Sequence, residues 1–157
     1  MSLASLRERV EQELKELSEG VAEVERIMGK YQQSQDSDLL PAVAMNLQSF
    51  YTGVERVMVA VVLYCEQAVP EGQDWHRQLL RQMGQDDQVR PALISEDLLL
   101  DLDELRRFRH VVRSIYAFKL DPALLFPITQ RLPQCYQLFR EQCIQFLGQL
   151  TDWETQG

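Results

Sequence analysis

The chain is poor in the residues that build the commonest metal centres and disulfide frameworks. Its 157 residues include two histidines, His76 and His110, and three cysteines, Cys65, Cys135 and Cys143. None of them stands at the short spacings of a zinc site, so we expect no metal and no cofactor. The three thiols fall on apolar helical faces, which is typical of reduced cysteines in a cytosolic protein.

Several other motifs are absent. The sequence has no glycine-rich phosphate loop, no nucleophile elbow and no spaced carboxylate quartet of the di-iron type, which removes most common enzyme classes. The apolar run at residues 57–64 is too short to span a bilayer. Residues 1–14 are studded with Arg, Glu and Lys, so we expect no signal peptide, no membrane contact and a cytoplasmic location.

The chain also lacks a positive charge balance. Its formal net charge is −8, which argues against indiscriminate binding to nucleic acid. Any contact with a nucleic acid must therefore come from a local basic patch.

What is present is helical periodicity, without a credible strand. Apolar residues at spacings of three and four predict a long helix over residues 3–31 and a central helix from Ser37 or Asp38 to about Ala68. A short helix is expected from Asp74, a fourth from Ser95, and a last one from Asp121-Pro122, where Pro133 kinks or restarts it. These elements predict an all-α, antiparallel four-helix bundle with one short additional helix, forming a single domain over residues 1–157.

One helical stripe carries a charge where an apolar side chain is expected. Arg109 falls in the middle of the stripe formed by Leu98, Leu102, Leu105, Val112 and Tyr116. A guanidinium there needs a fixed anionic partner, a polar interface or a ligand. Glu55 lies on a comparable apolar stripe of the central helix, so we predict a buried Glu55–Arg109 pair; a charged dimer seam is the alternative.

Around Arg109 the chain is locally basic. The patch consists of Arg106, Arg107, His110, Arg113 and Lys119. Helical spacing projects Arg107, His110 and Ser114 to one side, a turn beyond Asp103. This pattern fits a solvated face with an Asp103–Arg107 pair, or a site for phosphate or an anionic partner. His76, beside Trp75, is interpreted as a surface or packing residue.

The chain resembles the HEPN superfamily, and within it the HepT group of small proteins that pair with minimal nucleotidyltransferases. The likeness rests on the long first helix, the segment Phe50-Tyr51-x-x-Val54-Glu55-Arg56, the Trp75-His76 helix and residues 108–116. The family motif is arginine, a polar residue, three variable residues, histidine, one variable residue and tyrosine. Here the arginine is Arg109, the polar residue His110 and the tyrosine Tyr116, while Ser114 stands in place of the histidine.

The resemblance implies a homodimer that acts in a toxin–antitoxin-type pair with a minimal nucleotidyltransferase. It also implies that Tyr116 is the residue to which the partner attaches AMP. In active members, arginine and histidine cleave RNA without metal in a cleft between protomers. Serine cannot transfer the proton, so we expect weak or absent ribonuclease activity, with Arg106, Arg113 and Glu55 as binding residues.

Two alternatives stay open. In the first, His110 replaces the missing histidine, and the protein is an active metal-independent endoribonuclease with Arg109 and RNA as its substrate. In the second, the chain is a non-catalytic helical dimerisation or interaction module in which Arg109 only stabilises a seam.

Overall fold

The computed structural model describes residues 1–65 and 67–156, with the side chains of 117 and 153–156 excepted. Within these ranges the chain is all-helical and contains no strand, which confirms the all-α prediction. The elements in chain order are α1 (Leu3–Ser34), η1 (Ser37–Leu39), α2 (Leu40–Tyr64), α3 (Trp75–Met83), α4 (Glu96–Arg113), η2 (Ala117–Lys119) and α5 (Pro122–Gln156).

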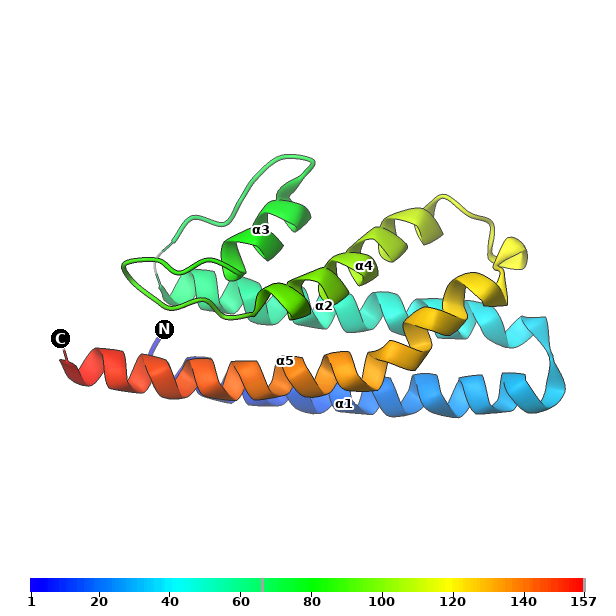
Figure 1. The fold of residues 1–157 in the computed structure, drawn as a ribbon, viewed down its shortest axis with the longest axis horizontal. Helices are drawn as coiled ribbons and strands as arrows, with labels where there is room; N and C mark the ends of the chain where they lie inside the picture. Colours follow the sequence, from blue (N-terminus) through cyan, green and yellow to red (C-terminus); the bar gives the residue numbers. More distant parts are fainter. Residues whose placement is uncertain (66, 157) are drawn as a thin grey trace.

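The long helices pack along one another around α2. Helices α1 and α2 form an antiparallel hairpin, and α5 lies beside α1 over much of its length (Figure 1). Helix α4 packs on α2 at an inclination, and the short α3 lies over the later half of α2. The apolar sequence of α2 fits this central place, because residues on nearly all of its faces are buried.

Helix α2 ends earlier than the predicted Ala68. Its last residue is Tyr64 and Cys65 is the C-cap, with the Gln67 amide bonded to the Val62 carbonyl at 3.0 Å. Pro70 disfavours helical backbone at the residue before it, which helps to explain why the helix does not continue toward that proline.

Helix α5 begins where the sequence predicts. The carboxylate of Asp121 accepts a hydrogen bond from the Ala123 amide at 2.9 Å, next to Pro122 at the first helical position. The helix then continues through both Pro127 and Pro133 rather than restarting. Its first part is bent relative to the rest (Figure 1), as expected when prolines interrupt the backbone hydrogen bonds.

Helix α4 begins at the predicted cap and ends before the predicted stripe does. Ser95 accepts a hydrogen bond from the Leu98 amide, but the helix stops at Arg113. Both the amide and the hydroxyl of Ser114 bond to the Val111 carbonyl, at 3.1 and 2.7 Å, and this tightens the last turn. The prediction that Tyr116 continues the helical stripe of Arg109 is therefore wrong.

The segment between α3 and α4 is organised by a buried arginine that the sequence did not single out. Arg90 is 1% exposed and donates to the Gln67 side chain at 2.8 Å. It also donates to the carbonyls of Gln82, Gln85 and Pro91, each at 3.0 Å. These bonds join the end of α3 to the segments on both sides of it.

Helices of the length and hydropathy needed to cross a membrane are absent from the part of the chain described above.

Candidate functional site

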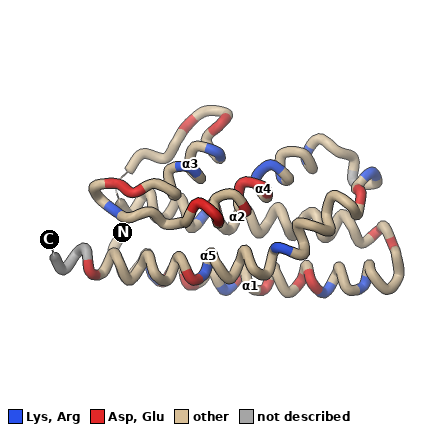
Figure 2. Tube along the Cα trace, in the orientation of Figure 1, with Lys and Arg blue, Asp and Glu red and all other residues tan. Residues whose placement is uncertain are grey.

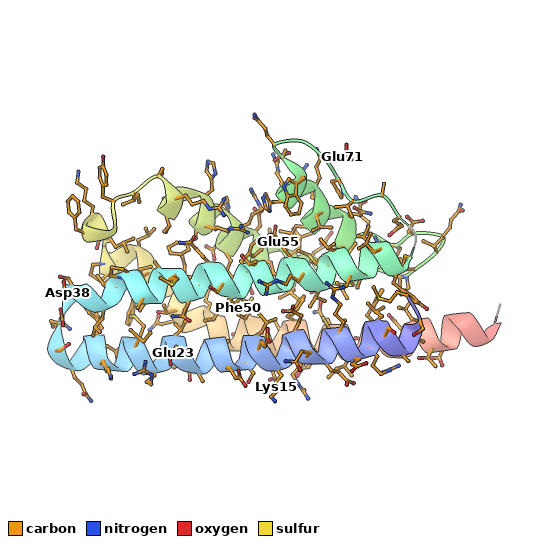
Figure 3. All side chains as sticks on the ribbon, turned by 180° about the vertical axis from the view of Figure 1, so that it is seen from behind. Lys15, Glu23, Asp38, Phe50, Glu55 and Glu71 are labelled. Carbon is orange, nitrogen blue, oxygen red and sulfur yellow. The ribbon has the colours of Figure 1, made fainter. Side chains whose placement is uncertain are left out.

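The site is built around a carboxylate in the most apolar helix. Helical spacing places Glu55 one turn after Tyr51 and one turn before Met58 or Val59, on the face of α2 that α3 and α4 cover. Glu55 is 5% exposed. In Figure 3 it lies between α2 and these two helices. An ionised carboxylate at this depth is stable only when it is paired.

Both oxygens of Glu55 have a partner. Arg109 Nη1 on α4 donates to Oε1 at 2.8 Å, so the predicted Glu55–Arg109 pair is present. His76 on α3 contacts Oε2 through Nδ1. One carboxylate thus joins three helices, and both pairings are partly shielded from solvent.

His76 is fixed from two sides. Its Nδ1 is engaged by Glu55, and its ring stacks on Trp75 with 3.8 Å between the ring centroids. The side chain retains 29% of its exposure. The Nε2 atom is therefore the ring nitrogen left for a ligand.

Above the Glu55–Arg109–His76 cluster lies a pocket of about 90 Å³ between α2, α3 and α4. Its lining is dominated by groups that donate hydrogen bonds, and consists of Tyr51, Gln73, Asp74, His76, Arg77, Arg106, Arg109, His110 and Arg113. Figure 2 shows Lys and Arg positions on both α3 and α4. We refer to this feature as the arginine pocket.

The lining of the arginine pocket carries four arginines and one carboxylate, Asp74, so its formal charge is positive although the chain as a whole is acidic. Arg109 is neutralised by Glu55, and Arg106 by Asp103, with 2.8 Å between Nε and Oδ1. Arg77 and Arg113 have no carboxylate within 4.0 Å among the described side chains. Their charges are available to an anion, and guanidinium groups suit phosphate oxygens geometrically.

A buried hydroxyl completes the lining. Tyr51 is fully buried, and its hydroxyl has no hydrogen-bond partner within the described structure. Burial, and then the neighbouring Glu55 carboxylate, raise the pKa of Tyr51 well above its ordinary value. The hydroxyl therefore stays protonated as an unused donor at the base of the pocket.

The structure brings together only some of the predicted site residues. Arg106, Arg109, His110 and Arg113 line the arginine pocket, and Glu55 lies behind it. Arg107 lies on an exposed surface and pairs with Asp103 at 3.4 Å, as the alternative of a solvated face predicts.

Ser114 and Tyr116 do not line the pocket. Ser114 is the C-cap of α4, and its hydroxyl is bonded to the Val111 carbonyl of the last turn. Tyr116 lies beyond the helix and is 70% exposed. It stacks on Phe118 with 5.6 Å between centroids, and Lys119 Nζ lies 5.8 Å from its ring.

Five pocket residues were not predicted as site residues, and two of them, Gln73 and Asp74, come just before α3. His76 and Arg77 come from α3, and Tyr51 lies one turn before Glu55 on α2. The spacing of Tyr51 and Glu55 is a signal that could have been used. For His76 no periodic signal existed, because its contact with Glu55 joins two different helices.

The described side chains include no cluster of three or more His, Cys, Asp or Glu suited to hold a metal ion. All three cysteines are free, with Cys135 and Cys143 buried. The arginine pocket is lined by cations, imidazoles, a hydroxyl, the Gln73 amide and the Asp74 carboxylate, and the excess of donors over this one carboxylate suits an oxyanion.

A model of the HepT-like protein family matches residues 42–150. The match spans α3, α4 and most of α2 and α5, and so includes every element that lines the arginine pocket. No curated protein and no solved structure matches the chain. Since the matched range covers most of the sequence, the chain belongs to the HepT-like protein family.

Proposed function

We propose that this protein binds a minimal nucleotidyltransferase in a toxin–antitoxin-type pair and receives AMP on Tyr116. The observation that carries the proposal is the place of Tyr116, a motif residue that is 70% exposed just beyond α4. A tyrosine in an exposed turn can enter the active site of another protein without unfolding of the core. The family membership of the chain supports this partner.

The test is adenylylation followed by intact-mass measurement. Wild-type protein and Tyr116→Phe are incubated with ATP, magnesium and the nucleotidyltransferase, with Tyr31→Phe on α1 as the matched control. We expect AMP addition to wild type and to Tyr31→Phe, and none to Tyr116→Phe. Equal modification of Tyr116→Phe refutes the assignment of Tyr116, and absence of both a complex and modification refutes the partner.

We propose that the ribonuclease activity of the protein is weak or absent, because its HEPN motif is incomplete. Ser114, which stands where the motif has histidine, has a hydroxyl bonded to the Val111 carbonyl and lies outside the pocket lining. A serine cannot transfer the proton as an imidazole does near neutral pH.

A second candidate function is metal-independent cleavage of RNA with Arg109 and His110. The observation that favours it is that both line one positively charged pocket. Cleavage of RNA in EDTA by wild type but not by Arg109→Ala is the expected result under this function. Equal cleavage by both proteins would point to a contaminating nuclease.

We further propose a cytoplasmic homodimer in which residues 1–157 form one domain with a HEPN-type four-helix bundle. Helix α1, which precedes the matched range, supplies buried residues such as Leu6, Leu14 and Val24 to the same core as α2 and α5. Leu100 and Val111 are exposed on α4, which supports a contact there. Light scattering of wild type and Leu100→Glu tests the dimer: a monomeric wild type refutes it.

A further inference from the structure

Glu55 has more partners than a simple buried pair requires. Arg109 alone would compensate its charge, yet the second oxygen holds His76, whose other ring nitrogen is left for the arginine pocket. A carboxylate that fixes one nitrogen of an imidazole sets the ring orientation and stabilises the imidazolium when it forms. This arrangement is suited to proton transfer.

We infer that His76, positioned by Glu55, is the proton-transferring residue of the arginine pocket and acts there on an RNA phosphodiester. The inference rests on the second candidate function, cleavage of RNA in the arginine pocket, and revises it by naming His76 in place of His110 as the base. It also assigns the role of the missing motif histidine to a residue of a different helix, 38 positions before Ser114.

The pocket has the donors that a phosphodiester needs. Arg113 and Arg77 carry charges without carboxylate partners in the described structure, and the Tyr51 hydroxyl is a buried donor without an acceptor. Arg109 bonds to Glu55 through one of its five N–H groups, which leaves others to face a ligand. A pocket of about 90 Å³ holds several waters or one phosphate-sized group.

The proposed step is a transesterification within the RNA. His76 Nε2 takes the proton of a ribose 2′-hydroxyl, and the 2′-oxygen forms a bond to the adjacent phosphorus. The bond from phosphorus to the 5′-oxygen breaks, and that oxygen leaves with the electron pair and takes a proton from water. The products are a 2′,3′-cyclic phosphate and a 5′-hydroxyl, and His76 returns its proton to solvent.

The surrounding residues have separate roles in this step. Arg109 and Arg113 stabilise the negative charge that grows on the phosphoryl oxygens. Glu55 is a positioning residue, since it touches His76 and not the reacting atoms. His110 lines the same pocket but is exposed and has no carboxylate to orient it among the described residues, so it is not the base.

The test compares His76 with a control position on the same helix. Untagged full-length wild type, His76→Gln and Arg81→Gln are incubated in EDTA with a short single-stranded RNA, and products are examined for the cyclic phosphate. Glutamine keeps a donor for Glu55 but cannot transfer a proton. We expect His76→Gln to lose about 100-fold or more of the rate, while Arg81→Gln, at an exposed position of α3 outside the pocket lining, keeps it.

A second measurement does not depend on a substitution at His76. In His110→Gln, His76 is the single histidine, so the effect of diethyl pyrocarbonate on the cleavage that this variant retains, reversed by hydroxylamine, reports on His76. Loss of cleavage on modification and recovery with hydroxylamine are expected. Added imidazole should restore cleavage by His76→Ala and leave Arg109→Ala inactive, a result that a purely structural role of His76 does not give.

Each outcome has a definite meaning. If wild type does not cleave RNA, both the inference and the second candidate function fail. If cleavage depends on Arg109 but persists in His76→Gln, the inference alone fails. Modification of Tyr116 by the nucleotidyltransferase is measured separately, so the partner function stands or falls by its own assay.

Discussion

Removal of the Arg109 guanidinium should reveal the energetics of the buried carboxylate. In Arg109→Leu, Glu55 stays 5% exposed and loses the cation at 2.8 Å while keeping only His76. Breaking a buried pair on one side typically costs about 3–5 kcal/mol. Because His76 still contacts the carboxylate, we expect about 3 kcal/mol, a large part of the stability of a small domain.

The decisive comparison is the double variant. Glu55→Leu with Arg109→Leu removes both charges and leaves an apolar seam between α2 and α4, so its free energy of unfolding should lie within about 1 kcal/mol of wild type. Urea titrations of wild type, the two single variants Glu55→Leu and Arg109→Leu, and the double variant yield the coupling energy between the two side chains. We expect this energy to be about 2 kcal/mol or more. If Arg109→Leu unfolds at the same urea concentration as wild type, Glu55 is solvated and the electrostatic account of the site is wrong.

Three further predictions concern buried groups outside this pair. Burial raises the pKa of Tyr51, so the folded state holds that proton more tightly than the unfolded chain does. This stabilisation is present below pH about 10 and is lost as the pH rises above it. In urea titrations, Tyr51→Phe should therefore flatten the fall in the free energy of unfolding between pH about 9 and 11. Burial raises the pKa of all three thiols, that of Cys135 to about 12. Native protein at pH about 8 should therefore react slowly with a thiol reagent. Half-buried Cys65 should react first, and Cys135 and Cys143 should react only after unfolding. Arg90→Met should lower the free energy of unfolding by about 3 kcal/mol, measured by urea titration, because three backbone carbonyls lose their donor; an unchanged urea midpoint would show that water replaces it.

The sequence was sufficient for the parts of the site that follow from periodicity. Glu55 and Arg109 have opposite charges, and each interrupts an apolar stripe of its helix. Because both stripes are buried, the sequence predicts that the two side chains pair with each other, as they do. The caps at Ser95 and Asp121 were predictable for a similar reason, since their side chains bond the first amides of the helices that follow.

Other features depend on contacts that no spacing encodes. His76 reaches Glu55 from a separate helix 21 residues later, and Arg90 organises a loop through backbone carbonyls. Tyr116 was misplaced because apolar periodicity continues past the residue where the helix ends. No glycine or proline marks that end, which is set by the bonds of Ser114 to the last turn.

The delivery of His76 by α3 has a consequence for local opening of the protein. Helix α3 has nine residues, too few to be stable alone, and depends on burial of Leu79, Leu80 and Met83 and on the contact with Glu55. When α3 detaches, the pocket loses an imidazole and the carboxylate gains water, while the long helices can remain folded. An anion that bridges α3 and α4 would hold the closed form, so occupancy of the pocket and protection of the α3 amides from hydrogen exchange should rise together.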